Sequence, residues 1–134
     1  MTKEKLLYEC TRVRKAIEIA STKNICRDVG VHHFPLGCCG IASLVLGIWL
    51  LRFAKDIEYV HGWRDNQSHA WLEYQGWIID ITADQFEKIN EKVLITDNRT
   101  FYDCFEEEGR VFVSKMDVNQ YERELFDFVR ENIK

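Results

Sequence analysis

The chain has 134 residues, of which 46% are hydrophobic and 13% are aromatic. This length and composition predict a single domain over residues 1–134, with enough apolar side chains for a real core. The formal net charge of −4 supplies no basic excess to neutralise phosphates, which argues against nucleic acid as the main partner. A local basic patch is still compatible with this overall charge.

The N-terminus and the cysteines indicate a protein of the cytoplasm. The first ten residues, MTKEKLLYEC, are charged and lack the pattern of a signal peptide. The longest apolar run, residues 41–54, is short for a membrane span and contains Arg52. The five cysteines are odd in number and show no CxxC spacing, so we expect neither a disulfide framework nor a structural zinc site. Free thiols in a reducing compartment fit this pattern.

The first part of the chain predicts two helices. Residues 3–22 carry an apolar stripe at helical spacing, with charged residues between its members. The stripe consists of Leu6, Cys10, Val13, Ile17 and Ala20. Residues 23–38 predict an irregular connection, and residues 39–55 predict a second helix with apolar side chains on nearly all sides. Such a helix is normally buried in the middle of a domain, and Cys10 is expected to be a core residue beside it.

Strand patterns follow the second helix. The expected strands are residues 57–63, 68–74, 77–83, 92–96 and 110–114. The second and third of these flank Gln75-Gly76, which predicts a hairpin with a two-residue loop. The acidic run 106–108 is expected to be a solvated turn before Gly109.

A helical spacing returns at residues 118–133, with Asp117 as the expected N-cap and Gln120 as its reciprocal partner. No internal repeat, linker or low-complexity tract interrupts the chain. Helices are thus followed by strands and then by a final helix. This order predicts an α+β fold with an antiparallel sheet.

Two adjacent thiols, Cys38 and Cys39, lie in a turn directly before the second predicted helix. A thiolate there would meet the positive end of the helix dipole and unpaired N–H groups. The dipole lowers a thiol pKa by about one unit, which is too little for a thiol that begins near about 8.5. An ionised nucleophile therefore needs an imidazolium beside it.

His69 is the best candidate for that imidazolium. With a two-residue loop, the residue numbers of each pair of partners across the hairpin have the same sum. Trp71 then faces Asp80, and His69 is the diagonal neighbour of Asp80 on the same face of the sheet. A carboxylate there is expected to accept the Nδ1 proton and to leave Nε2 toward the sulfur. A three-residue loop would put Asp80 on the opposite face, in which case Asp65 or Asp84 would be the alternative carboxylate.

Together these segments resemble the transglutaminase-like branch of the papain-like superfamily. The matching motifs are Gly37-Cys38-Cys39 before a buried helix, SHAWLE from residue 68 on one strand and WIID from residue 77 on the next. The resemblance covers residues 34–86. It implies a central buried helix packed on an antiparallel sheet, with flanking N- and C-terminal helices.

The resemblance also implies roles for individual residues. Cys39 takes the nucleophile position of the Gly-x-Cys motif, His69 is the general base and acid, and Asp80 orients the imidazole. The backbone N–H of Cys39 is one donor to the oxyanion. Many papain-like enzymes have a glutamine before the nucleophile, and this chain has none in its first 66 residues. The second donor stays open, with the side chains of Asn24, His32 and His33 or another backbone N–H as alternatives.

These inferences lead to a thiol-dependent hydrolase that acts on a peptide or side-chain amide of a protein or peptide substrate, without cofactor or metal. Acyl transfer to an amine, as in transglutaminases, is the alternative reaction. A non-catalytic interaction module on the same fold is a further alternative. A metal site built from the paired thiols and nearby histidines is weaker, because adjacent ligands suit tetrahedral geometry poorly.

Overall fold

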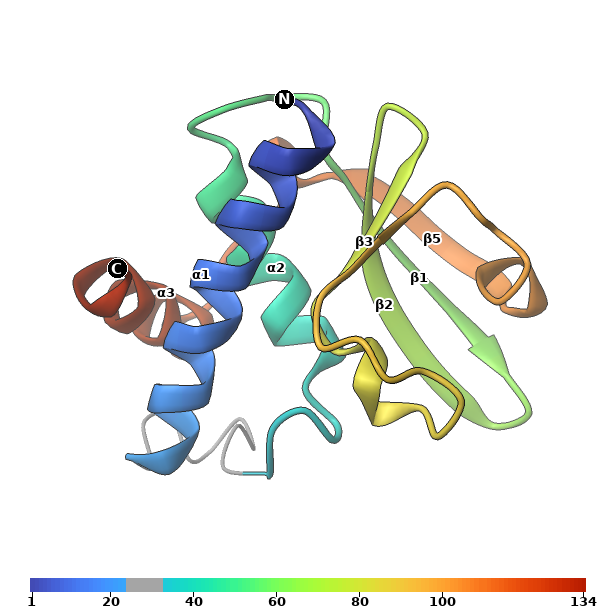
Figure 1. Ribbon diagram of the computed structural model, residues 1–134, viewed down its shortest axis with the longest axis horizontal. Helices are drawn as coiled ribbons and strands as arrows, with labels where there is room; N and C mark the ends of the chain where they lie inside the picture. The colour runs from blue at the N-terminus through green and yellow to red at the C-terminus, as the bar shows by residue number, and fades with distance from the viewer. Residues whose placement is uncertain (24–32) are drawn as a thin grey trace.

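The computed structural model describes residues 1–23 and 33–134 (Figure 1). Within these residues the helices are α1 (Lys3–Thr22), α2 (Cys39–Leu50) and α3 (Gln120–Asn132). The strands are β1 (Glu58–Arg64), β2 (Gln67–Tyr74), β3 (Trp77–Asp80), β4 (Leu94–Thr96) and β5 (Glu106–Phe112). Neighbouring strands pair antiparallel in the order β4-β3-β2-β1-β5. The predicted α+β class is confirmed.

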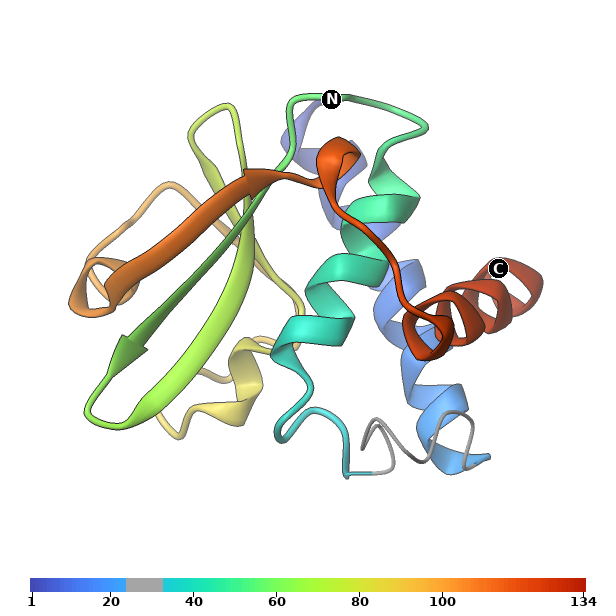
Figure 2. The ribbon, with the colours of Figure 1, turned by 180° about the vertical axis from the view of Figure 1, so that it is seen from behind.

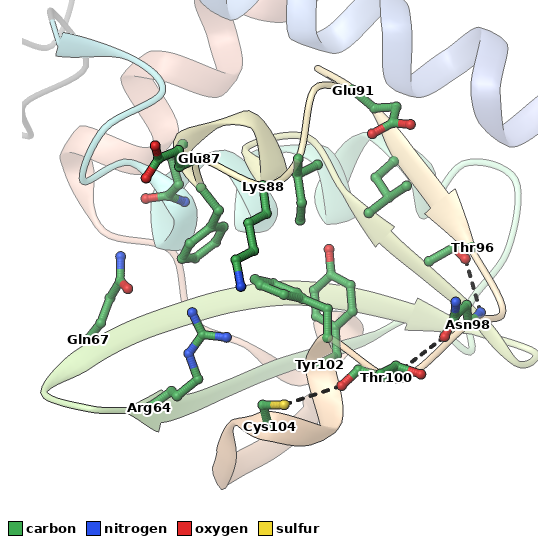
Figure 3. Close-up of a pocket in the computed structure, with 15 residues that line it drawn as sticks. Arg64, Gln67, Glu87, Lys88, Glu91, Thr96, Asn98, Thr100, Tyr102 and Cys104 are labelled. Atoms are coloured by element: carbon green, nitrogen blue, oxygen red, sulfur yellow. Dashed lines mark hydrogen bonds between the residues drawn. The ribbon is translucent and has the colours of Figure 1, made fainter.

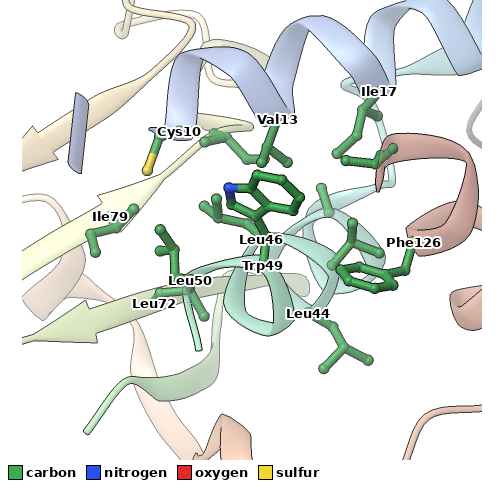
Figure 4. Close-up of a cluster of buried hydrophobic side chains, with 14 of the residues drawn as sticks. Cys10, Val13, Ile17, Leu44, Leu46, Trp49, Leu50, Leu72, Ile79 and Phe126 are labelled. Atoms are coloured by element: carbon green, nitrogen blue, oxygen red, sulfur yellow. The ribbon is translucent and has the colours of Figure 1, made fainter. Parts of the chain in front are cut away.

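Helix α2 lies in the middle of the molecule, between the sheet and the other two helices (Figures 1 and 2). Its side chains Leu46 and Trp49 belong to one buried apolar cluster with Val13 of α1, Leu72 of β2 and Phe126 of α3 (Figure 4). Because α2 is enclosed from several directions, its apolar residues cover nearly its whole circumference. This central position places the start of α2 beside the sheet.

Helix α1 has the predicted bounds. The Thr2 hydroxyl accepts the Lys5 backbone N–H and so caps the first turn. The predicted apolar stripe is fully buried, and Cys10 is a core residue as expected. Glu9 is also buried, and its carboxylate accepts the indole N–H of Trp49 at 3.0 Å. A buried charge held in this way joins α1 to α2.

Helix α2 ends at Leu50 rather than near residue 55. The N–H groups of Phe53 and Ala54 both bond to the Leu50 carbonyl, which closes the helix in a turn. Arg52 and Phe53 are exposed, so no apolar burial favours a further helical turn. Across the described residues, every helix falls short of the length or the apolar character that crossing a membrane requires.

The hairpin of β2 and β3 has the predicted register. Leu72 pairs with Ile79, and Tyr74 pairs with Trp77 across a two-residue loop. Gln75 has φ 48 and Gly76 has φ 84, a left-handed pair that matches the twist of a tight hairpin. Strand β3 ends at Asp80 rather than at residue 83, because the chain turns there into a short 3₁₀ segment, Ala83–Gln85.

The prediction for the acidic run was wrong, because residues 106–108 form the first half of β5. This strand is the sheet edge, where alternate side chains can remain in water, so charge does not prevent pairing with β1. A bulge interrupts the register at His61/Gly62, opposite Glu108. His61 Nε2 would lie 2.5 Å from a Cβ at Gly109, so a side chain at this position would require the His61 ring to shift.

The N-cap of α3 also differs from the prediction. Asn119, not Asp117, accepts the Glu122 N–H, and the Glu122 side chain accepts the Asn119 N–H. This reciprocal pair is a capping box shifted along the chain from the predicted one. Both candidate caps are followed by a residue that can return the bond, so the sequence alone did not distinguish them.

Candidate functional site

The turn at residues 33–37 delivers two thiols to the start of α2. Leu36 N–H bonds to the His33 carbonyl at 2.9 Å, and Gly37 has φ 70, a conformation that favours glycine. Cys38 is the N-cap residue, and no side chain caps this helix. The first N–H groups of α2 are therefore not engaged by a capping side chain and face the site.

The two thiols have different surroundings. Cys38 is fully buried, and its Sγ lies 3.3 Å from the Leu36 carbonyl oxygen. Burial, and then the nearby charge of Cys39, raises the pKa of Cys38 to about 11. Cys38 is thus a protonated core thiol at neutral pH. Cys39 is the first residue of α2 and is only partly buried, so it is the thiol that a substrate can reach.

His69 and Asp80 form a buried pair. Their relative exposures are 1% and 0%, and His69 Nε2 lies 2.6 Å from Asp80 Oδ2. The predicted nitrogen assignment was wrong, because Asp80 bonds to Nε2 and not to Nδ1. The two residues are diagonal neighbours across the hairpin, and Nε2 is the ring nitrogen farther from the backbone, so it is the one that spans this diagonal.

Asp80 is held by two further residues. Tyr102 donates its hydroxyl proton to Oδ2 at 2.8 Å, while the backbone N–H and the hydroxyl of Thr82 donate to Oδ1 at 3.0 and 3.2 Å. The sequence analysis missed both residues. An Asp followed two positions later by Thr is a local signal for the Thr82 contact. No spacing rule points to Tyr102, which comes from a loop that folds back over the sheet.

Aromatic rings enclose the His69 side chain. The nearest is Phe86, whose ring edge meets the imidazole with centroids 4.7 Å apart. Trp71 and Phe105 lie at 5.7 Å each. Trp71 is therefore a packing residue. The rings exclude water, so the charges of Asp80 and Cys39 act strongly on the imidazole.

The His69 pKa is raised to about 9 from its ordinary value of 6.5. Burial alone would lower it, but the charge and hydrogen bond of Asp80 and the hydrogen bond and charge of Cys39 outweigh burial. The folded state thus binds this proton more tightly than the unfolded chain. The resulting contribution to the free energy of unfolding is complete below pH 6.5 and is lost as the pH rises through about 9.

The three residues chosen from the sequence come together here. The Cys39 thiol is close enough to the His69 ring to raise its pKa. Because Asp80 occupies Nε2, Nδ1 is the nitrogen left for the sulfur. The Gln85 amide nitrogen lies 3.3 Å from the same Nδ1 and 3.2 Å from the Thr82 hydroxyl. Gln85 thus contacts the ring at the nitrogen that Asp80 leaves unoccupied.

Tyr59 is a further polar group beside Cys39 that the sequence analysis missed. A Cβ added at Gly40, the residue after Cys39, would lie 3.3 Å from the Tyr59 hydroxyl oxygen. Burial, then the charges of Cys39 and Glu122, raises the Tyr59 pKa to about 12, so the hydroxyl keeps its proton at neutral pH. Among the described residues this hydroxyl has no hydrogen-bond partner.

The alternative carboxylates lie elsewhere. Asp84 forms a two-pronged ion pair with Arg14, with contacts of 2.7 and 2.9 Å. Asp65 is in the β1–β2 turn with φ 49. Neither therefore orients His69. His33 is exposed, and the other side chains suggested as oxyanion donors, Asn24 and His32, lie outside the described residues.

Metal binding was the weaker alternative for the paired thiols. In the part of the chain that the structure describes, no three His, Cys, Asp or Glu side chains are arranged to hold a metal ion. Of the histidines in that alternative, His32 lies outside this part. Cys10, Cys39 and Cys104 are free thiols.

Comparison with known proteins adds no relative. No family model, no curated protein and no solved structure matches the chain. The interpretation of the site therefore rests on its own geometry.

Proposed function

We propose that this protein is a thiol-dependent hydrolase that cleaves a peptide or side-chain amide through Cys39, His69 and Asp80. The observation that carries the proposal is the buried His69–Asp80 pair, 2.6 Å apart, with the Cys39 thiol close enough to raise the His69 pKa. The central α2 helix on an antiparallel sheet is also compatible with a papain-like fold of the transglutaminase-like branch. That likeness remains part of the proposal.

The geometry suggests a two-step reaction. The Cys39 thiolate forms a bond to the amide carbonyl carbon, whose oxygen takes up the electron pair. As the oxyanion collapses, the C–N bond breaks and His69 gives the Nδ1 proton to the leaving amine, which leaves a thioester. His69 then takes a proton from water while that water attacks the thioester, and the acid product departs from Cys39.

Tyr59 is proposed as the second oxyanion donor. Its protonated hydroxyl, which has no partner among the described residues, lies close to Gly40, the residue after Cys39. Two donors at the developing charge are what an acyl-transfer site requires. The absence of a side chain at residue 40 leaves room for that hydroxyl.

Tyr59→Phe is expected to slow acylation of Cys39 about 100-fold, because one oxyanion donor is lost. The measurement compares two reagents, p-nitrophenyl acetate, which forms an oxyanion, and iodoacetamide, which alkylates sulfur without one. Alkylation should keep its wild-type rate, since the thiol and His69 are unchanged. Equal acylation of both proteins, or an equal loss with both reagents, would contradict this role.

The proposed reaction is tested by peptide mapping after p-nitrophenyl acetate is added. Wild-type protein should carry the acetyl group on Cys39 and release p-nitrophenolate with turnover. Cys38→Ser should behave like the wild type, and Cys39→Ala should not react. The exposed Cys104 is an internal reference thiol. Acetylation of Cys104 without acetylation of Cys39 would contradict the proposal.

The second product distinguishes hydrolysis from acyl transfer. In the same reaction, added methylamine competes with water for the acetyl thioester. We expect acetate to remain the main product, and mainly N-methylacetamide would indicate the transferase alternative. The free thiols of Cys10, Cys39 and Cys104 suit a reducing compartment, and the cytoplasm is the proposed location.

A further inference from the structure

A cavity of about 730 Å³ lies beside the candidate site, between the loop over residues 85–104 and the β1–β2 hairpin (Figure 3). Arg64 and Gln67 form its hairpin side. On the loop side lie Lys88 and Phe101, among others. The cavity is open to solvent in a size range that suits a side chain or a short segment of peptide.

The cavity shares a wall with the His69–Asp80 pair. Gln85, Phe86 and Tyr102 all line the cavity. The same three residues contact the pair, through the Gln85 amide at 3.3 Å from His69 Nδ1, the Phe86 ring and the Tyr102 hydroxyl on Asp80. A single layer of side chains therefore separates the cavity from the groups that handle the proton.

Two cations project into this cavity without a carboxylate partner among the described residues. The Arg64 guanidinium lies 5.1 Å from the ring centroids of both Phe101 and Phe105. The Lys88 amine points toward Arg64, whereas the carboxylates of Glu87 and Glu91, which also line the cavity, are directed away from this part of it (Figure 3). Other cations near the site are paired, including Arg14, Arg99 and Arg110. Two unpaired cations, of which Arg64 lies over aromatic rings, favour a carboxylate with an apolar stem.

We propose that this cavity binds an acidic residue of the peptide substrate. That the bound peptide is a substrate rests on the proposed function, whereas the binding of an acidic residue in the cavity does not. The net charge of −4 would otherwise repel acidic peptides, so Arg64 and Lys88 supply the local attraction. A side chain held in the cavity would place the neighbouring backbone near Gln85 and the catalytic groups.

The test uses Cys39→Ala protein, in which no turnover disturbs binding. Its partners are acetyl-Ala-Phe-Glu-Glu-Ala-amide and the same peptide with both Glu replaced by Gln. We expect the acidic peptide to bind about tenfold more tightly in calorimetric titration at low salt, and to lose this advantage as salt is raised. Chemical shifts of cavity residues should change with the acidic peptide.

Arg64→Gln and Lys88→Gln, each in the Cys39→Ala protein, should remove most of the preference. Lys92→Gln is the matched control, because Lys92 is an exposed cation on the same loop and does not line the cavity. Equal affinity for both peptides, or an equal loss in the Lys92→Gln protein, would overturn the inference. If the acidic peptide binds but wild-type Cys39 is not acetylated, the proposed reaction is refuted and the cavity proposal stands. If Cys39 is acetylated but the acidic peptide is not preferred, only the cavity proposal is refuted.

Discussion

Asp80→Asn should lower the rate of Cys39 acylation by about 10³–10⁴-fold, the loss typical of a triad whose orienting carboxylate becomes an amide. Asp80 Oδ2 now accepts protons from His69 Nε2 and from the Tyr102 hydroxyl. In Asp80→Asn, the amide NH₂ group at this position would be a third donor that faces these two donors. The imidazole proton would then move to Nδ1, the nitrogen beside the sulfur. In that tautomer His69 cannot accept the thiol proton.

The pKa of His69 reports the same change directly. Wild-type protein should show an imidazole titration near pH 9 in NMR spectra. In Asp80→Asn the main charge that raises this pKa is gone, and burial should move the midpoint below 6.5. Asp84→Asn is the control, because its carboxylate pairs with Arg14, and its titration should follow the wild type. An unchanged acylation rate or an unchanged imidazole titration midpoint in Asp80→Asn would contradict the proposed role of Asp80 in orienting His69.

Arg14→Met is expected to reduce the free energy of unfolding by about 3–5 kcal/mol, the range for breaking a buried ion pair from one side. Arg14 is only 4% exposed, and its guanidinium donates to both Asp84 oxygens and to the Ile81 and Lys92 carbonyls. Methionine fills part of the space but leaves these acceptors without their donor.

Urea unfolding followed by circular dichroism measures this loss. Lys15→Met, on the exposed side of the same helix, is the control and should change stability by less than about 0.5 kcal/mol. A loss below 1 kcal/mol in Arg14→Met, on the order of a surface ion pair, would mean that the Arg14 contacts are not stabilising. Arg14→Met/Asp84→Leu should recover part of the loss, because no carboxylate is then left buried without a partner.

Local patterns predicted much of the fold. The bounds of α1 followed from a continuous apolar stripe and a threonine cap, and the Gln75-Gly76 loop set the hairpin register. This register is what brought His69 and Asp80 to one face. The edge strand at 106–108 was missed because its side chains face water, and a solvated strand carries the same charges as a solvated turn.

The environment of the site depended on contacts that no local pattern encodes. Tyr59 reaches Gly40 from a different element, and Tyr102 bonds to Asp80 from a loop, 22 residues farther along the chain. The choice between Nδ1 and Nε2 also depends on tertiary distances. Sequence reasoning could therefore select Cys39, His69 and Asp80 as candidates, but not the residues that hold them.

The distances along the chain between these contacts suggest an order of assembly. His69 and Asp80 are 11 residues apart and can meet as soon as their hairpin forms, whereas Arg14 and Asp84 are 70 residues apart. Closing the longer loop costs more chain entropy and generally comes later. His69 and Asp80 can thus be paired before α1 is docked. Cys39 is the first residue of α2 and joins this pair only when α2 packs against the sheet, so a partly folded chain lacks the assembled group of three residues.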